Sequence, residues 1–328
     1  MPSEADVRSE ASVVLSGYGP VGRAYAERLT GGALPLRLAA VRTSAAEGLP
    51  PEPRGGWGPL PPLAETLERT EAAVLAQAVP SSPAVREQAA ADALSALRRG
   101  VHVVTATKSH LLSHWSELAL AAAEGGSRIR ISGATGAALP TADLARIGVR
   151  GLGCRTLRAC PNGTATFVLD RLADGEPLPD AVAEAQRRGI AEADPTADLS
   201  GADAAVKVRL LAALLWGWDA TAVRTEAGPG IDAGTAEAAR AAAARGRRLR
   251  SVATASADEP LVVRVGLAET GPGDPLHALR GPEKAAVYGC PEAGDITVSG
   301  GRSSPLGAAL AMVKDTLDVA GPVGSGFA

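Results

Sequence analysis

The sequence predicts an α/β protein, in which a doubly wound parallel sheet is followed by an α+β domain built on an antiparallel sheet. Three observations support this fold class. Short apolar runs alternate with helical stretches over roughly the first 135 residues, a glycine-rich turn follows the first run, and apolar runs follow one another closely near the C-terminus. With 328 residues, the chain is long enough for two hydrophobic cores.

The first domain is predicted from five apolar runs that are bounded by turn residues and separated by helical stretches. The predicted strands are Val13–Ser16, Leu36–Arg42, Val74–Val79, Val101–Thr105 and Arg128–Ser132, and the predicted helices are Arg23–Leu29 and Pro83–Arg99. The segment Leu49–Pro62 is rich in proline and glycine, which predicts a surface excursion without regular structure. Because strands and helices alternate, we expect this sheet to be parallel.

The pattern changes after residue 135. Helices are predicted at Asp180–Arg188 and Ala202–Trp216, strands at Leu249–Ala255, Leu261–Leu267, Ala285–Tyr288 and Asp295–Val298, and a last amphipathic helix at Leu306–Leu317. Strands that follow one another with little helix between them favour an antiparallel sheet. We therefore predict a first domain at 1–135, a second at 136–302, and a C-terminal helix within 303–328 that packs back on the first domain.

Composition indicates an ordinary globular protein. Net charge is −3, hydrophobic residues make up 46% and charged residues 21%, so we expect neither a nucleic acid nor a membrane as partner. We find no apolar run of membrane-spanning length and no secretory leader, which favours a cytoplasmic location. The three cysteines lack metal-ligand spacing, so we interpret them as reduced thiols and predict no metal site.

The glycine-rich turn reads Gly17-Tyr18-Gly19-Pro20-Val21-Gly22, directly after the first strand and before the first helix. In such a turn the first glycine permits the bend, the second lets a pyrophosphate approach the backbone, and the third allows close packing of helix on strand. The position strengthens a motif that would be weak alone. The first domain is thus predicted to be a Rossmann domain that binds a nicotinamide dinucleotide with these residues.

The end of the second strand bears on the choice between NADP and NAD. An acidic residue there would favour NAD, but the chain reads Arg42-Thr43-Ser44. A guanidinium with two hydroxyls suits a 2′-phosphate, which favours NADP. The alternative is that Arg42 is a solvated loop charge, which leaves NAD open. Thr105, at the end of its strand, is also assigned to the cofactor site.

The chain has four lysines among its 33 lysine and arginine residues, so each lysine is a candidate for proton chemistry. Lys108 follows the carboxyl end of a buried strand, where ligands of open α/β sheets bind. Lys207 follows an acidic segment, Glu192 to Asp203. An alternative interpretation makes Ser200 and Asp203 a capping box and Asp203–Lys207 a simple helical ion pair.

A further turn, Asn162-Gly163-Thr164, precedes a helical stretch and offers backbone amides and hydroxyls to a substrate or to the nicotinamide, with a plain turn as the alternative; we assign it to the substrate. Taken together and in this order, the motifs resemble the homoserine dehydrogenase family. The matching segments are Gly17–Gly22, Val103–Lys108, Ala134–Pro140, Asn162–Thr164, and Ala191–Asp198 followed by Gly201–Lys207. The last of these is the most specific part of a resemblance that spans nearly the whole chain.

The resemblance implies residue roles and a reaction. It makes Lys108 and Lys207 the proton-transfer lysines, Glu192 a ligand of the substrate's amino or hydroxyl group, and Asp203 a partner that positions substrate and Lys207. A hydride would pass from the reduced nicotinamide to the aldehyde carbon of an aspartate-semialdehyde-like substrate, while a lysine ammonium protonates the alkoxide. The resemblance also implies a homodimer formed through the second domain, which would be both catalytic and dimerising.

Three departures from the family pattern leave the substrate open. Thr107 replaces an asparagine, Ser132 replaces a glutamate that helps to hold a monovalent cation in some members, and Arg302 adds a charge to a loop expected near the cofactor. We expect no C-terminal regulatory domain. The alternatives are a paralogue that acts on another amino-acid-derived aldehyde or alcohol, and a cofactor-binding protein without turnover.

Overall fold

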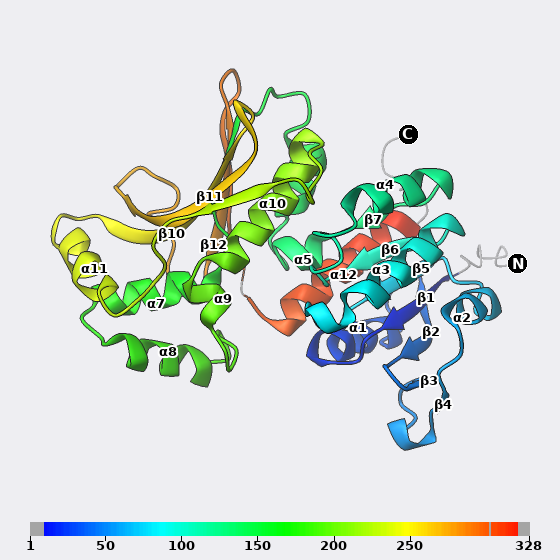
Figure 1. The fold of residues 1–328 in the computed structure, drawn as a ribbon. Coiled ribbons are helices and arrows are strands. Elements are labelled where there is room, and N and C mark those ends of the chain that lie inside the picture. The colour runs from blue at the N-terminus through cyan, green and yellow to red at the C-terminus, as the bar shows by residue number, and fades with distance from the viewer. Residues whose placement is uncertain (1–9, 302, 321–328) are drawn as a thin grey trace, which may run out of the picture. The chain divides into compact units, whose positions relative to one another are not determined.

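A computed structural model of the chain describes residues 10–301 and 303–320. Within these residues the chain forms two compact units (Figure 1). Unit 1 contains the residues up to Gly133 and those from Ala309 onward, and unit 2 contains Ala134–Ala308. Among the described residues, no helix combines the length and apolar character needed to cross a membrane.

Unit 1 contains a seven-stranded sheet in the order β4-β3-β2-β1-β5-β6-β7. Five strands pair in parallel, which confirms the predicted doubly wound sheet; they are β1 (Ala11–Ser16), β2 (Leu36–Arg42), β5 (Val74–Gln77), β6 (His102–Thr105) and β7 (Ile129–Arg130). The main helices are α1 (Pro20–Thr30), α2 (Leu63–Arg69), α3 (Pro83–Arg98) and α4 (Trp115–Glu124). The strand order reverses between β1 and β5, so the carboxyl ends of these two strands mark the expected ligand crevice.

The predicted excursion, Leu49–Pro62, is wrong in part, because a short helix and a short strand lie within it. Strand β3 (Ala46–Gly48) pairs antiparallel with β2, and β4 (Gly58–Pro59) pairs with β3, with the short helix η1 (Arg54–Gly56) between them. Trp57 packs against Gly48 and donates its Nε1 proton to the Glu52 carbonyl at 3.0 Å. Strands of two or three residues give no periodicity to detect, and tertiary packing of the indole holds them instead.

Unit 2 contains a six-stranded sheet in the order β13-β12-β8-β10-β11-β9. Its strands are β8 (Thr156–Cys160), β9 (Arg224–Ala227), β10 (Arg248–Ser256), β11 (Glu259–Thr270), β12 (Lys284–Cys290) and β13 (Gly294–Gly300). The expectation of an antiparallel sheet needs one correction, because β9 pairs with β11 in parallel. Longer helices accompany the sheet: α7 (Gly163–Ala173), α8 (Leu178–Arg187), α10 (Ala202–Trp216) and α11 (Thr235–Ala244). Shorter ones are α5 (Ser132–Thr135), α6 (Thr141–Asp143), η2 (Leu144–Gly148) and α9 (Thr196–Leu199).

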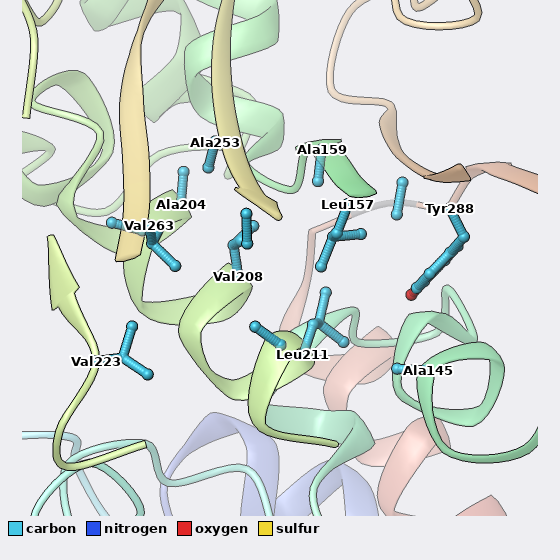
Figure 2. Close-up of a cluster of buried hydrophobic side chains, with 14 of the residues drawn as sticks. Ala145, Leu157, Ala159, Ala204, Val208, Leu211, Val223, Ala253, Val263 and Tyr288 are labelled. Carbon is cyan, nitrogen blue, oxygen red and sulfur yellow. The ribbon is translucent and has the colours of Figure 1, made fainter. Parts of the chain in front are cut away.

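Helix α10 packs on one face of this sheet through apolar side chains of the second core. Val208 and Leu211 of α10 face Leu157 of β8 and Ala253 of β10 (Figure 2). Tyr288 of β12 joins the same core, and its hydroxyl donates to the Thr141 carbonyl at 2.6 Å. This packing fixes α10, and with it Asp203 and Lys207, against β8, whose end leads into Pro161 and Asn162.

The last helix, α12 (Pro305–Ala320), contributes to the core of unit 1. Met312 and Val313 belong to the same buried cluster as Val13 and Tyr25, and the Tyr25 hydroxyl lies 2.7 Å from that of Thr316. The division between the units falls after residues 133 and 308, whereas the sequence placed it near 135 and 302.

Candidate active site

The glycine-rich turn joins β1 to α1 at the carboxyl end of the parallel sheet. Gly17 has a φ of +96°, and a Cβ on it would lie 2.4 Å from the Ala78 carbonyl oxygen. A Cβ on Gly22 would lie 2.1 Å from the Gly17 carbonyl oxygen, so α1 approaches the turn at a distance that only glycine allows. Gly19 differs, because no other atom lies within 4 Å of the position that its Cβ would take.

The start of α1 fits the phosphates of a dinucleotide. The helix begins at Pro20, has Gly19 as its N-cap, and has no acidic side chain in its first turn. Its first backbone amides therefore lack helical acceptors, and the helix dipole favours an anion there. With the open side of Gly19 beside them, these amides form a cradle of the kind that holds a pyrophosphate.

Arg42 is buried at the end of β2, with 7% of its surface exposed, so the alternative of a solvated loop arginine is wrong. Its guanidinium donates to the Glu47 carboxylate at 2.7 Å, to the Pro61 carbonyl at 2.8 Å and to the Thr66 hydroxyl. A 2′-phosphate at this position would share Arg42 with Glu47. The neighbouring Thr43 hydroxyl accepts from the backbone amide of residue 46 at 3.0 Å, and residue 44 is exposed.

Lys108 follows β6, next to the point where the strand order reverses. The Thr105 hydroxyl, which is buried, accepts from the Thr107 amide at 2.9 Å, and the Thr107 hydroxyl donates to the Val79 carbonyl at 2.8 Å. The Lys108 amide donates to the Ser81 hydroxyl at 2.8 Å. These bonds tie the segment after β6 to the segment after β5. They hold Lys108, half-buried, at the carboxyl edge of the parallel sheet.

Unit 2 brings three of the predicted residues together. Lys207 and Asp203, one helical turn apart on α10, form an ion pair of 2.6 Å. The Asn162 side-chain amide donates to the same Asp203 oxygen at 2.8 Å and to Asp198 of α9 at 2.6 Å. The Lys207 ammonium also donates to the Pro161 carbonyl at 3.1 Å. Two carboxylates, one amide and one ammonium therefore converge at the start of α7.

The capping-box interpretation of Asp203 is wrong. The N-cap of α10 is Gly201, which has a φ of +80° and makes no side-chain cap. Asp203 instead takes part in the cluster with Asn162 and Lys207. Asn162 does cap a helix, because its Oδ1 accepts from the Ala165 amide of α7 at 2.9 Å. One side chain thus fixes the start of α7 and orients the Asp203 carboxylate.

Three predicted substrate residues lie differently from this cluster. Glu192 is exposed, and its carboxylate forms no hydrogen bond or ion pair with the residues that the structure describes. The Thr164 hydroxyl is buried and donates to the Ile190 carbonyl at 3.1 Å. Gly163 is also buried, and a Cβ on it would lie 2.4 Å from the Pro282 carbonyl oxygen.

Sequence reasoning missed two residues of the cluster, Asp198 and Lys284. Lys284 begins β12, is 2% exposed, and donates from Nζ to the Gly136 carbonyl at 2.8 Å. Burial lowers the pKa of Lys284 to about 8, the nearby charge of Lys207 lowers it as well, and Asp203 opposes both effects. The scarcity of lysine was the one available signal, because position 284 stands at the edge of a predicted strand without a motif around it.

Ser132 lies where the family pattern has a glutamate. Its amide and hydroxyl donate to the carboxylate of Asp315 on α12, at 2.9 and 2.7 Å, and Lys314 donates to the Ser132 hydroxyl at 3.0 Å. Burial raises the pKa of Asp315, while Lys314 and the bonds from Ser132 lower it. A carboxylate from another part of the chain thus lies beside Ser132. Arg302 lies outside the described residues.

Family comparisons agree with both units. The model of the family described as homoserine dehydrogenase matches residues 140–317, and that of the homoserine dehydrogenase NAD-binding domain matches residues 17–132. The NAD(+)-dependent homoserine dehydrogenase of Pseudomonas canavaninivorans is 31% identical over 75% of this chain and 70% of its own length. The homoserine dehydrogenase of Corynebacterium glutamicum is 32% identical, but the chain spans only 54% of that protein.

Solved structures with the same fold cover nearly the whole chain. A homoserine dehydrogenase from Thiobacillus denitrificans superposes with a TM-score of 0.82 at 25% identity, over 95% of this chain and 73% of its own. A hyperthermophilic archaeal homoserine dehydrogenase in complex with NADPH has a TM-score of 0.77 at 22% identity, over 94% of this chain and 97% of its own.

Proposed function

Because the chain belongs to the homoserine dehydrogenase family, we propose that it interconverts homoserine and aspartate 4-semialdehyde. It is an NAD(P)-dependent oxidoreductase of that family. The observation that carries the proposed reaction is the cluster of Asn162, Asp203 and Lys207, in which an ammonium is held by a carboxylate that is itself fixed by an amide. A protein that only binds a cofactor has no need of such an arrangement.

A nicotinamide dinucleotide held by the glycine-rich turn, Gly17–Gly22, would supply or accept the hydride at the carbonyl carbon of the substrate. Lys207 donates a proton to the substrate oxygen in the reducing direction and accepts it back in the oxidising direction. Asp203 and the Pro161 carbonyl keep the Lys207 ammonium in place, since both accept hydrogen bonds from it. Lys108 is the second proposed proton-transfer lysine. Glu192 is proposed to bind the substrate's amino group, for which its carboxylate is exposed.

The preference for NADP over NAD is part of the proposal and depends on Arg42. Its guanidinium carries the charge that a 2′-phosphate requires, yet Glu47 already accepts from it at 2.7 Å. We expect Glu47→Gln to strengthen NADPH binding relative to NADH and Arg42→Gln to weaken it, both measured by titration of nicotinamide fluorescence. Equal NADPH-to-NADH affinity ratios in the three proteins would remove Arg42 from the site.

The proposed activity is tested by following nicotinamide absorbance with purified protein, homoserine and NADP or NAD. We expect Lys207→Met and Lys108→Met to reduce kcat by about 100-fold or more, the range for loss of a general acid–base group. Lys314→Met is the matched control, because Lys314 bonds to Ser132 and Asp315 rather than to the cluster. Cofactor binding without turnover of homoserine would refute the activity, and turnover of another amino-acid alcohol would identify a paralogue.

The proposed homodimer has the resemblance as its only support. Sedimentation or light scattering of the purified chain measures the mass directly, and a monomer at micromolar concentration would contradict it.

A further inference from the structure

Lys284 is a buried lysine whose ammonium is only partly satisfied. An ammonium has three N–H donors. The Gly136 carbonyl, at 2.8 Å, is the one acceptor that they reach within the described part of the chain. At 2% exposure, solvent cannot supply the rest. A buried cation without an anionic partner is costly, so its place in the fold calls for an explanation.

The strand register places Lys284 beside the residues that hold Lys207. Ala285 of β12 is paired with Cys160 of β8, so Lys284 adjoins the peptide that continues from β8 into Pro161 and Asn162. The Pro161 carbonyl is the one that accepts from Lys207. The same two segments also meet at Pro282, two residues before Lys284. There the Pro282 carbonyl closely approaches Gly163, which follows Asn162.

The charged groups around Lys284 come mainly from α10. Lys207 and Asp203 both act on it through their charges. Asp198 of α9 approaches the cluster through Asn162, which it shares with Asp203. Among the described residues, the neighbouring strands add no charge next to Lys284, since Gly300 of β13 is its register partner and the buried Cys160 thiol of β8 has its pKa raised to about 12.

We propose that Lys284 is a positioning residue of this site, whose charge beside Lys207 and Asp203 adjusts how readily Lys207 releases its proton. The role assigned to Lys207 rests on the proposed function, but the coupling between the two amines does not. With Lys284 protonated, a second positive charge opposes the charge of the Lys207 ammonium and favours loss of its proton. With Lys284 neutral, the Asp203 carboxylate holds that ammonium without this opposition.

Because interactions between titrating groups are reciprocal, the coupling can be read from either amine. The pKa of about 8 for Lys284 lies close to physiological pH, so its charge changes within a pH range that assays can cover. Lys284→Arg keeps the charge throughout this range, and Lys284→Met removes it throughout. As pH rises through 8, the wild-type site should therefore change from the charged state of Lys284→Arg to the neutral state of Lys284→Met.

The direct test is NMR of the ligand-free protein labelled only in its lysine side chains, which gives four signals to assign by substitution. We expect one signal to titrate near pH 8 and to disappear in Lys284→Met. In Lys207→Met the midpoint of the Lys284 signal should rise by about one unit, the size expected for removal of a like charge nearby. Lys314→Met should leave the Lys284 midpoint unchanged. A Lys284 midpoint near 10.5 in the wild type, or one that does not move in Lys207→Met, would overturn the proposal.

The kinetic test uses the pH dependence of kcat with homoserine. The kcat of the wild type should match that of Lys284→Arg at pH 6.5 and that of Lys284→Met at pH 9.5. A merely structural role would not produce this crossover. Profiles of the same shape in all three proteins would contradict the positioning role. Coupled lysine titrations in a protein that does not oxidise homoserine would refute the proposed function while leaving the coupling in place. The wild-type titration needs no variant to fold.

Discussion

Adding a single methyl group to the glycine-rich turn should separate cofactor binding from folding. In Gly22→Ala the new Cβ would lie 2.1 Å from the Gly17 carbonyl oxygen, so α1 must move by about 1 Å to reach ordinary contact. Overpacking of this kind costs about 1–3 kcal/mol of stability. In Gly19→Ala the new methyl meets no atom within 4 Å, and Gly19 has a φ of −76° that any residue adopts. Its stability should stay within about 0.5 kcal/mol of wild type.

The two variants should nevertheless both lose the cofactor. At Gly19 the methyl occupies the open side of the turn, where the pyrophosphate would approach, and we expect NADPH to bind about 30-fold more weakly, or about 2 kcal/mol. Fluorescence titration measures the affinity and urea unfolding the stability. Gly58→Ala is the control, because its Cβ also meets nothing within 4 Å but lies outside the turn. Wild-type affinity in Gly19→Ala would refute the placement of the dinucleotide, and wild-type stability in Gly22→Ala would refute the close-approach argument.

Three further variants test stability and the site. Burial, with a smaller effect of His114, lowers the pKa of His110 to about 4, below its unfolded value of 6.5. Between these two pH values, unfolding therefore takes up a proton. As pH falls from 6.5 to 4, the unfolding free energy of the wild type, measured by urea titration, should fall by about 3 kcal/mol relative to that of His110→Leu. Parallel pH dependences in the two proteins would contradict this. Asp170→Ala should lower the unfolding free energy by about 3–5 kcal/mol, because it leaves the buried charge of Arg250, which is 1% exposed, without its ion-pair partner. A loss below 1 kcal/mol would refute a buried pair. Asn162→Ala should cost about 1 kcal/mol through the lost cap and reduce kcat/KM at least tenfold; unchanged kinetics would exclude it from the site.

The long elements were predictable because their boundaries carry local signals. Helix α10 runs from Ala202 to Trp216 as predicted, since Gly201 and Gly217 flank it with φ values of +80° and +70°. Strand β2 likewise has the predicted bounds, Leu36–Arg42, because its apolar residues are nearly continuous, as in a buried strand of a parallel sheet. Such elements depend on neighbours along the chain, so a single sequence contains the information that determines them.

Elements held by distant contacts were not predictable in the same way. Strand β9 is exposed along its length, and its parallel pairing with β11 leaves no apolar alternation to detect. Lys284 resembles any other lysine until β12 pairs with β8 and places it next to Pro161. The cluster of Asn162, Asp203 and Lys207 was recognised through motifs of a known family. Asp198 stood in the same motif but without a role, because only the fold shows that Asn162 bridges the two carboxylates.

Arg42 shows why a correctly located charge does not determine a ligand. From the sequence, Arg42 was predicted to lie at the end of β2, where a 2′-phosphate would bind, with its neighbours in a loop. In the structure the chain turns back at once, and the register pairs Arg42 with Glu47 across two antiparallel strands. Glu47 also accepts from Arg69 and Thr66, so its carboxylate is held in place from three sides. The affinity for a 2′-phosphate therefore depends on how strongly Glu47 competes for the guanidinium, which is a property of the β2–β3 register and not of the residue types at the end of the strand.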